Sequence, residues 1–344
     1  MTRLRVGVVG CGFICQVAHL PSLASNSKVE LVALADKRTA LANMVSRRYS
    51  VASVYSHHKD MLSSESLDAI FVITRRVHTF EVVKDFLASG HAVFSEKPMA
   101  QTRDNAEELV SLADERVTTY SVGYMRRFDS GVRRLRTFLE SDHQLGPLLN
   151  FFMELIGGDD YCGIGPFVTS TEPKPLIGSY PRAPVNLPDH LKIEYERFLN
   201  VCGHNINLLR FILGDDCLVS DVSHSVNGFS TARLSFAGVD GNFSWRFDPR
   251  LSVWYEQLVM NFERGRVTLK LPPAFLRNQC GTLLIENFDS RKSVLHDSDN
   301  SWSFKNEVDD FVENCINESS SSINSGRECL GDYKIIDSIW HCLT

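Results

Sequence analysis

The sequence predicts a two-domain α/β protein, in which a doubly wound parallel sheet is followed by an α+β domain with a large, mainly antiparallel sheet. Three observations support this prediction. Apolar strands alternate with helices over the first 125 residues, a glycine-rich turn follows the first strand, and period-two patterns occur later in the chain. A length of 344 residues suits two domains, since a typical domain has about 150 residues. The 43% hydrophobic and 23% charged residues are typical of globular proteins.

The elements of the first domain follow from apolar runs and from apolar residues at helical spacing. The predicted strands are residues 6–9, 29–35, 67–73, 92–95 and 118–122. The predicted helices are residues 39–48, 78–88 and 102–115, with a further amphipathic segment after the first strand. This alternation implies right-handed crossovers and a parallel sheet that helices cover on both faces.

A Gly-Cys-Gly-Phe-Ile-Cys turn joins the first strand to the segment that follows it. Gly10 permits the sharp turn, and Gly12 lets backbone amides approach a pyrophosphate at the positive end of a helix. Phe13 and Ile14 lie in the same turn and belong to the predicted cofactor site. Cys15 stands where a third Gly or Ala is usual, at a position that serves helix–strand packing. Residues 1–125 are therefore interpreted as a dinucleotide-binding Rossmann domain; a glycine turn without a ligand is the alternative.

Asp36 ends the second predicted strand and favours NAD as the cofactor. Its carboxylate would accept hydrogen bonds from the adenosine ribose hydroxyls and would repel a 2′-phosphate. Lys37 and Arg38 follow directly and could attract that phosphate, so NADP is the alternative. A turn or helix-capping role is the second alternative for Asp36.

Glu96 and Lys97 follow the predicted strand 92–95. In open α/β sheets, ligands bind outside the carboxyl ends of the strands. A lysine beside a carboxylate can orient a substrate hydroxyl and help to move its proton. Both residues are assigned to the cofactor site, and Lys97 is also the first catalytic and substrate-binding candidate. A surface ion pair is the alternative.

Residues 126–344 are interpreted as a substrate-binding and oligomerisation domain. Apolar and polar residues alternate over 243–247 and 267–271, which is typical of strands with one buried face. Hairpin turns are expected at residues 240–241 and 264–265. An antiparallel sheet with one covered face is the simplest interpretation.

Residues 157–189 form a Pro/Gly-rich stretch without periodicity. The stretch is longer than an ordinary connector, so we expect a functional loop that borders the substrate. Asp159 and Asp160 lie within it and, together with Arg126, are candidates for the substrate surface.

A predicted helix over residues 196–214 carries three polar side chains at positions i, i+4 and i+7. Asn200, His204 and Asn207 would therefore share one face of an otherwise apolar helix and point at a cleft. A buried core histidine is the alternative for His204. Other histidines, His19 among them, have no comparable polar residues at helical spacing and are interpreted as structural or solvated.

The order of the motifs resembles that of the Gfo/Idh/MocA oxidoreductases, the relatives of glucose–fructose oxidoreductase and inositol dehydrogenase. The resemblance includes the glycine turn, Asp36, His78, the Glu-Lys-Pro of residues 96–98 and the Gly-Tyr-Met-Arg-Arg-Phe-Asp of residues 123–129. It extends to residues 304–311, which resemble the helix that finishes the second domain in such chains. A terminal helix that packs back on the first domain is the alternative.

The resemblance implies an NAD(P)-dependent dehydrogenase or reductase that acts on a sugar, aminosugar or cyclitol. Hydride would move reversibly between the nicotinamide C4 and a carbinol carbon. The family has an Asp-x-x-x-His-x-x-Asp pattern; here His204 matches, whereas Asn200 and Asn207 replace the carboxylates. An amide cannot carry a proton, so the proton route depends on Lys97 and His204. Thr74 and His78 complete the predicted cofactor site.

The remaining sequence features limit the partners of the protein. A net charge of −6 argues against nucleic acid or an anionic membrane, and no apolar run approaches the roughly 20 residues that span a bilayer. Glycines interrupt the apolar start of the chain, so we expect a cytoplasmic protein without a signal peptide. None of the nine cysteines forms a CxxC pair, and no metal is expected. By resemblance, the open sheet face packs on a second subunit in a homodimer or homotetramer.

Two other functions fit the same fold. One is a non-catalytic NAD(P)-binding sensor or regulator, because fold does not determine function. The other uses transient oxidation by NAD to drive an elimination or a glycoside hydrolysis, which would leave net NAD unchanged.

Overall fold

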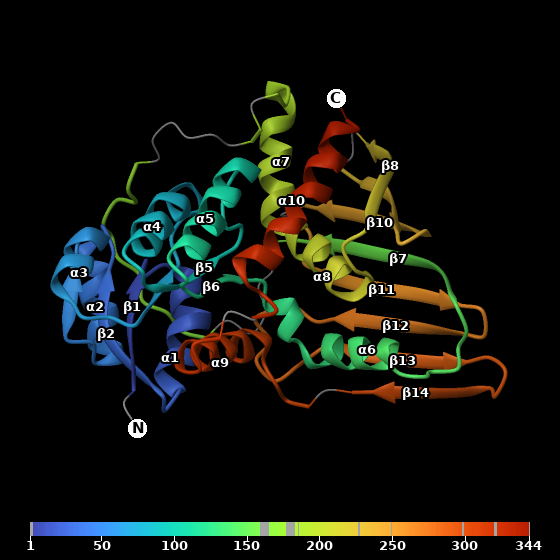
Figure 1. The fold of residues 1–344 in the computed structure, drawn as a ribbon, viewed down its shortest axis with the longest axis horizontal. Coiled ribbons are helices and arrows are strands. Elements are labelled where there is room, and N and C mark those ends of the chain that lie inside the picture. Colours follow the sequence, from blue (N-terminus) through green and yellow to red (C-terminus); the bar gives the residue numbers. More distant parts are fainter. Residues whose placement is uncertain are drawn as a thin grey trace. The chain divides into compact units, whose positions relative to one another are not determined.

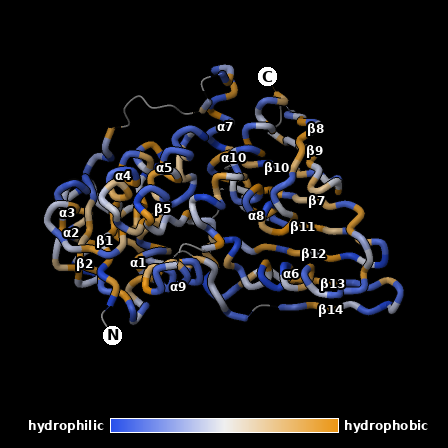
Figure 2. The backbone as a smooth tube through the Cα atoms, viewed as in Figure 1, coloured by the Kyte–Doolittle hydropathy of each residue, from blue (hydrophilic) through white to orange (hydrophobic). Residues whose placement is uncertain are grey.

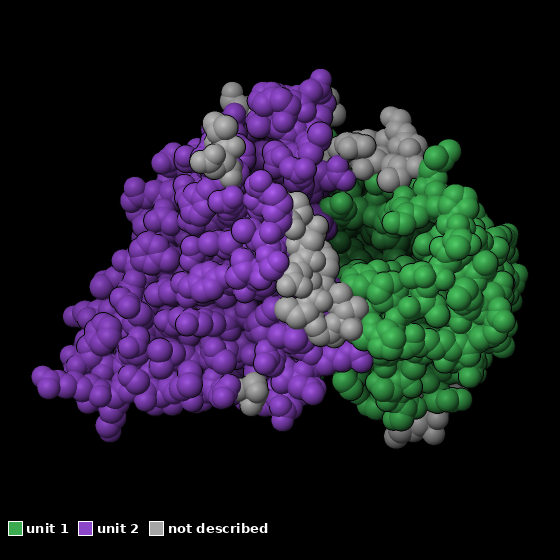
Figure 3. All heavy atoms as spheres, turned by 180° about the vertical axis from the view of Figure 1, so that it is seen from behind, with its two compact units in different colours: residues 1–124, 165–186, 304–330 green, residues 125–164, 187–303, 331–344 purple. Residues whose placement is uncertain are grey.

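The computed structural model describes residues 3–158, 165–176, 183–184, 186–225, 228–248, 250–297, 299–319 and 322–343. The chain divides into two compact units, which Figure 3 distinguishes by colour. The first unit comprises Met1–Tyr124, Gly165–Asn186 and Phe304–Leu330. The second comprises Met125–Ile164, Leu187–Ser303 and Gly331–Thr344. Two later segments thus fold with the first 124 residues. The sequence interpretation of 1–125 and 126–344 allowed this for a terminal helix, but it did not include Gly165–Asn186.

The first unit contains a parallel sheet of six strands in the described part of the chain (Figure 1). Their order is β3-β2-β1-β4-β5-β6. The strands are β1 (Leu4–Val9), β2 (Val29–Ala35), β3 (Ser53–Tyr55), β4 (Ala69–Val72), β5 (Ala92–Glu96) and β6 (Tyr120–Gly123). The chain winds outward in both directions from β1, so the topological switch point lies between β1 and β4. The predicted doubly wound parallel sheet is confirmed.

Helices join these strands. They are η1 (Cys15–His19), α1 (Leu20–Ser25), α2 (Thr39–Tyr49), α3 (His58–Ser64), α4 (Arg76–Ala88), α5 (Arg103–Glu115) and, from the late segment, α9 (Ser303–Ile316). The sequence pattern predicts neither β3 nor α3. The strand is only three residues long, and α3 buries a single side chain, that of Met61. Short elements with little apolar surface carry almost no periodic signal.

Helix α9 supplies part of the first unit's core. Its residues Val308, Phe311 and Val312 are buried among apolar side chains of β1, β4 and β5. The Phe311 ring lies edge-on to that of Phe71, with centroids 5.2 Å apart. Residues 304–311 therefore belong to the core of the first unit, which agrees with the alternative that a terminal helix packs back on the first domain.

The second unit contains an eight-stranded sheet in its described part, in the order β14-β13-β12-β11-β7-β10-β9-β8. Its strands are β7 (Leu148–Gly157), β8 (Cys217–His224), β9 (Ser230–Phe236), β10 (Val239–Phe247), β11 (Trp254–Phe262), β12 (Gly265–Leu271), β13 (Thr282–Asn287) and β14 (Lys292–His296). Only the β7–β10 pair is parallel among these neighbours. The other elements are η2 (Met125–Phe128), α6 (Ser130–Glu140), α7 (Asp189–Val201), α8 (Gly203–Leu213) and α10 (Gly326–His341), which carries residues of both units.

The period-two patterns do form strands with one buried face. Hydrophobic and hydrophilic residues alternate along β11 and β12 in Figure 2, and the buried side chains of β12 are Val267, Leu269 and Leu271. The predicted mainly antiparallel sheet is confirmed.

The predicted hairpin turn at Asp240-Gly241 was wrong. The chain turns instead at Ala237 and Gly238, which both have positive φ, and Gly241 lies within β10. A Cβ on Gly241 would lie 2.5 Å from the Phe151 ring, so this glycine allows a close approach of β10 to β7. The second turn occupies residues 263–264, one residue before the predicted position.

Candidate cofactor and catalytic site

The glycine turn after β1 has the geometry that a bound pyrophosphate needs. Gly10 has φ +94°, and a Cβ there would lie 2.2 Å from the Ile73 carbonyl oxygen, so only glycine fits. A Cβ on Gly12 would meet no atom within 4 Å, so the backbone there borders open space. Helical conformation begins at Phe13. These residues therefore fit a dinucleotide whose phosphates lie at a helix N-terminus.

Asp36 connects the end of β2 to this turn. Its Oδ2 accepts a hydrogen bond from the Cys11 backbone N–H at 2.8 Å. Its Oδ1 accepts one from the Arg38 backbone N–H at 2.8 Å, and the Arg38 Nε lies 3.4 Å from the same oxygen. Asp36 thus occupies the position from which a carboxylate binds the ribose hydroxyls of a dinucleotide. Arg38, the predicted alternative phosphate ligand, is held beside it.

Glu96 and Lys97 lie at the carboxyl end of β5. His19 Nε2 and Glu96 Oε1 are 2.8 Å apart, and the His19 side chain is fully buried. Glu96 Oε2 accepts a hydrogen bond from the Lys97 backbone N–H at 3.1 Å. The contact between His19 and Glu96 was not predicted from the sequence. The signal that could have found this pair is the position of His19 on the same face as the apolar residues Cys15 and Leu23, all buried.

The environment of Lys97 changes its proton affinity. Burial lowers the pKa of the Lys97 ammonium from 10.5 to about 8. The nearby Glu96 charge opposes this shift, whereas the Arg76 charge adds to it. With a pKa of about 8, about one tenth of Lys97 is neutral at pH 7, far more than for an ordinary lysine. Lys97 can therefore both accept and donate a proton near neutral pH.

A second buried carboxyl group comes from α9. Glu307 is 1% exposed, and neither of its oxygens has a hydrogen-bond partner among the described residues. Burial raises the pKa of Glu307 well above its usual value, and the charges of Glu96 and Asp310 raise it further. These effects favour the neutral form. No role of Glu307 was predicted from the sequence.

The other predicted cofactor residues of the first unit follow β4. The Thr74 and Thr79 hydroxyl oxygens are 3.2 Å apart, and His78 lies in the first turn of α4. Burial lowers the pKa of His78, and the charges of Lys37 and Arg75 lower it further. The predicted cofactor residues therefore follow the carboxyl ends of β1, β2, β4 and β5. β2, β1, β4 and β5 are consecutive neighbours in the sheet.

In the second unit the predicted helix over 196–214 is divided. Helix α7 ends at Val201 and α8 begins at Gly203, with Cys202 between them. Asn200 lies in the last turn of α7 and His204 in the first turn of α8, and both are half-buried. The three polar residues therefore do not share the face of one continuous helix.

Asn207 does not face a cleft, contrary to the prediction. It is 1% exposed, its side-chain oxygen accepts a hydrogen bond from Arg127 Nε at 2.6 Å, and its Nδ2 donates to Asp332 Oδ2 at 2.8 Å. Arg210 Nη1 donates to the other Asp332 oxygen at 2.6 Å. The amide of Asn207 thus links a buried arginine to a buried carboxylate.

Arg126 was predicted to lie on the substrate surface, and the structure differs here too. Its side chain is 2% exposed and donates to Glu256 Oε2 at 2.5 Å and to the Pro272 carbonyl oxygen at 2.9 Å. Asn205 donates to the other Glu256 oxygen at 2.9 Å. The role of Glu256 was not predicted. Buried and more exposed residues alternate along β11, and Glu256 is one of the buried residues. Asp159 and Asp160 lie outside the described residues.

Within the part of the chain that the structure describes, no group of three or more His, Cys, Asp or Glu side chains could hold a metal ion. No helix among the same residues is both long and apolar enough to cross a membrane.

Residues 4–124 match the family model described as an oxidoreductase family with an NAD-binding Rossmann fold. Among curated relatives, the inositol 2-dehydrogenase/D-chiro-inositol 3-dehydrogenase of Shouchella clausii is 34% identical over 152 residues. This match covers 42% of the chain and 43% of the relative. The chain thus spans less than half of the length of this relative.

Solved structures with the same fold cover nearly the whole chain. The 3-ketoreductase KijD10 from Actinomadura kijaniata, in complex with TDP-benzene and NADP, superposes with a TM-score of 0.76 and 20% identity. The alignment covers 98% of this chain and 97% of that one. The dehydrogenase MviM from Clostridium difficile has a TM-score of 0.75 and 18% identity, covering 98% and 99%. Both likenesses support the two-unit fold.

Proposed function

We propose that the protein is an NAD(P)-dependent dehydrogenase or reductase of the Gfo/Idh/MocA type, because the model of that family matches residues 4–124. The substrate would be a sugar, aminosugar or cyclitol that carries a secondary alcohol or the corresponding ketone. The name of the relative from Shouchella clausii, an inositol dehydrogenase, supports this substrate class.

One observation carries the proposal. At the carboxyl edge of one parallel sheet, Asp36 is hydrogen-bonded to the glycine turn, and Lys97 has a pKa lowered to about 8. A site for a dinucleotide and a group that moves protons near neutral pH are what an alcohol dehydrogenase needs in addition to its substrate.

Bound nicotinamide would supply C4 as the hydride acceptor or donor. In oxidation, neutral Lys97 takes the proton of the substrate hydroxyl, and its charged form then stabilises the developing negative charge on that oxygen. In reduction, the Lys97 ammonium donates the proton. Glu96 accepts the Lys97 backbone N–H and is itself held by the buried His19, so it orients the end of β5.

In the second unit, we assign His204 to the same proton transfer and Asn200 to a hydrogen bond with a substrate hydroxyl. Asn207 and Arg126 are omitted from this assignment, because both are buried in polar contacts of the fold. Since Asn200 cannot ionise, it binds without carrying a proton.

We further propose a homo-oligomer formed through the eight-stranded sheet. Phe152 on β7 and Tyr255 on β11 point away from the buried face and are exposed. Large exposed apolar side chains on an open sheet face are typical of a protein interface. Size-exclusion chromatography with light scattering, on wild type and Phe152→Asp, tests this proposal; a wild-type monomer would contradict it.

The function itself is tested by screening sugars, sugar phosphates, aminosugars and inositols for NADH or NADPH fluorescence. We expect oxidation of one of these classes with stoichiometric formation of the reduced cofactor. Tight cofactor binding without turnover on any substrate would instead indicate a sensor. A changed sugar with no net change in NAD would indicate an elimination or a hydrolysis.

A further inference from the structure

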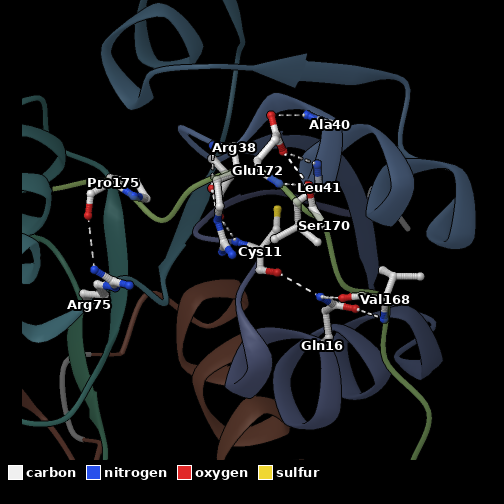
Figure 4. Close-up of polar contacts among 11 residues, drawn as sticks. Cys11, Gln16, Arg38, Ala40, Leu41, Arg75, Val168, Ser170, Glu172 and Pro175 are labelled. Atoms are coloured by element: carbon white, nitrogen blue, oxygen red, sulfur yellow. Dashed lines mark hydrogen bonds and ion pairs between the residues drawn. The ribbon is translucent and has the colours of Figure 1, made fainter.

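Residues 165–176 pack along the cofactor edge of the first unit, and we call this segment the strap (Figure 4). Gln16 Nε2 donates to the Val168 carbonyl oxygen at 3.0 Å, and the Val168 N–H donates to Gln16 Oε1 at 2.8 Å. Arg75 donates to the Pro175 carbonyl oxygen at 3.2 Å. The strap is part of the loop over residues 157–189 that we expected to border the substrate. The strap itself contacts the dinucleotide-binding unit.

The strap brings a carboxylate to the start of α2. The two oxygens of Glu172 accept hydrogen bonds from the backbone N–H groups of Ala40 and Leu41, each at 3.0 Å. The Ser170 hydroxyl donates to Glu172 Oε2 at 2.9 Å. Figure 4 shows Glu172 directed at these two N–H groups.

Helix α2 has no anion of its own at this end. Its N-cap residue is Arg38, which makes no side-chain capping bond, and its first turn contains no acidic residue. The first N–H groups of this 11-residue helix have no hydrogen-bond acceptor within the helix. Together with the helix dipole, they attract an anion. The hydrogen bonds from Ala40 and Leu41 lower the pKa of Glu172, and Ser170 and the Arg38 charge lower it further. Glu172 is thus held in its charged form.

This occupied anion site lies next to the position of the adenosine ribose. Arg38 immediately precedes α2 and is bonded to Asp36, the carboxylate that we assign to the ribose hydroxyls. A phosphate on the 2′ hydroxyl would lie beside Asp36. The groups that could neutralise it are Lys37, Arg38 and the first N–H groups of α2. Glu172 already uses those N–H groups.

We propose that Glu172 is a specificity-determining residue that makes this chain select NAD over NADP. Its carboxylate occupies the hydrogen-bond donors that a 2′-phosphate would need and adds a like charge beside it. Lys37 and Arg38 therefore do not create an NADP site despite their position. The proposal rests on the proposed function, because it assumes that the first unit binds a nicotinamide dinucleotide.

The test measures the dissociation constants of NAD and NADP by calorimetry for wild type, Glu172→Gln and Glu172→Ala. We expect wild type to bind NAD more tightly. In both variants NADP binding should tighten by about tenfold, the range of a charge-assisted contact at a helix terminus, whereas NAD binding should change by less than about threefold. If the substitutions merely loosened the strap, the affinities for NAD and NADP would change together. The ratio of the two dissociation constants therefore distinguishes an effect on cofactor selection from an effect on strap attachment.

Two control variants leave Glu172 in place. Glu115→Gln removes an exposed charge at the end of α5, and it controls for net charge. Arg48→Ala removes a strap contact, the hydrogen bond from Arg48 to the Pro166 carbonyl oxygen at 2.9 Å, and it controls for tethering. Neither control should change the NADP-to-NAD ratio by more than about twofold.

The outcomes separate this inference from the proposed function. An unchanged ratio in both Glu172 variants overturns the role of Glu172 and leaves the dehydrogenase proposal standing. Tighter binding of NADP than NAD by wild type, or an equal shift in the ratio for Arg48→Ala, also overturns it. If wild type binds neither dinucleotide, both proposals are wrong.

Discussion

The glycine turn after β1 and the Arg-Arg-Phe-Asp stretch that follows Met125 both belong to the motif order that resembles the family. Their residues have different physical tasks. At the turn, Gly12 borders open space and Asp36 lies at the sheet edge. In the second stretch, Arg126 and Arg127 are 2% and 1% exposed. One motif borders open space at the sheet edge, whereas the other is buried in the fold.

The burial of the second motif has identifiable partners. Arg126 binds Glu256, and Arg127 binds Asn207, which is bonded to Asp332. Asp129 accepts hydrogen bonds from the Gly131 N–H at the start of α6 and, at 2.8 Å, from the Gly281 N–H. A motif residue can thus be required because a buried carboxylate needs a cation, with no substrate involved.

Among the substitutions that test this difference between the two motifs, the largest effect on activity is expected at Lys97. Lys97→Ala should lower kcat by about 10²–10⁴-fold, because a group that transfers the hydroxyl proton is lost. The dissociation constant of NAD should change by only a few-fold. Stopped-flow kinetics and calorimetry on the same preparation give both values.

The matched control is Lys84→Ala, which removes an exposed lysine paired with Glu108. It should leave kcat unchanged. Normal turnover by Lys97→Ala would return the Glu96-Lys97 pair to a structural role.

Substitution of Asp332 tests the structural role of the buried polar network. Asp332→Ala leaves Arg210 and Arg127 without a buried carboxylate, and it should lower the free energy of unfolding by about 3–5 kcal/mol. Asp215→Ala removes the other carboxylate of Arg210, one that is 72% exposed, and should cost less than about 1 kcal/mol. Urea unfolding measures both. Equal losses for the two variants would show that burial does not determine the importance of this network.

The pH dependence should come from Lys97. Its pKa of about 8 is below the ordinary value, and oxidation needs the neutral form. The rate of oxidation should therefore rise about tenfold per pH unit below pH 8 and level off above it. Reduction needs the ammonium, so its rate should fall above about pH 8. Initial rates from pH 6 to 10 in both directions check this; a flat profile through pH 8 would contradict the role of Lys97.

Asp36 should have a smaller effect, limited to cofactor choice. Asp36→Ala should narrow the difference between the NAD and NADP affinities by several-fold, because ribose hydrogen bonds are lost and repulsion of a 2′-phosphate ends. Calorimetry with both cofactors measures the change. If wild type bound NADP tenfold more tightly than NAD, about 1.4 kcal/mol, Lys37 and Arg38 would instead be phosphate ligands.

The comparison also explains which parts of the candidate site could be predicted from the amino-acid sequence. The glycine turn, Asp36 and Lys97 are set by local geometry: a strand end, a turn that only glycine fits, and the next strands in order. Apolar periodicity likewise predicted the parallel sheet and most of its helices. Such features need no knowledge of distant residues.

Contacts distant in sequence could not be predicted in the same way. Asn207 looks like a ligand on a helix face, and only the fold brings Arg127 and Asp332 to it. Glu172 lies in a segment without periodicity, and 131 residues separate it from Leu41, the N–H donor of α2 that it binds. Spacing along the chain carries no information about such pairs.

The smallest effect is expected at Asn200, where the sequence departs from the family pattern. Asn200 and His204 lie on either side of the break between α7 and α8. A neutral hydrogen bond to a substrate hydroxyl acts in the ground state and the transition state alike. Asn200→Ala should therefore raise KM by about 2–10-fold, the range of one neutral hydrogen bond, with kcat little changed.

His204→Ala is the comparison variant for Asn200→Ala, because it removes a side chain that can carry a proton. It should abolish most turnover, whereas Asn200→Asp, which restores the family carboxylate, should keep the wild-type kcat within a few-fold. Steady-state kinetics on the substrate found in the screen separates kcat from KM for all three variants. If Asn200→Ala lost as much kcat as His204→Ala with KM unchanged, Asn200 would act in the transition state. His204 would then no longer be the principal proton carrier of the second unit, and the distinction between binding amide and reacting imidazole would fail.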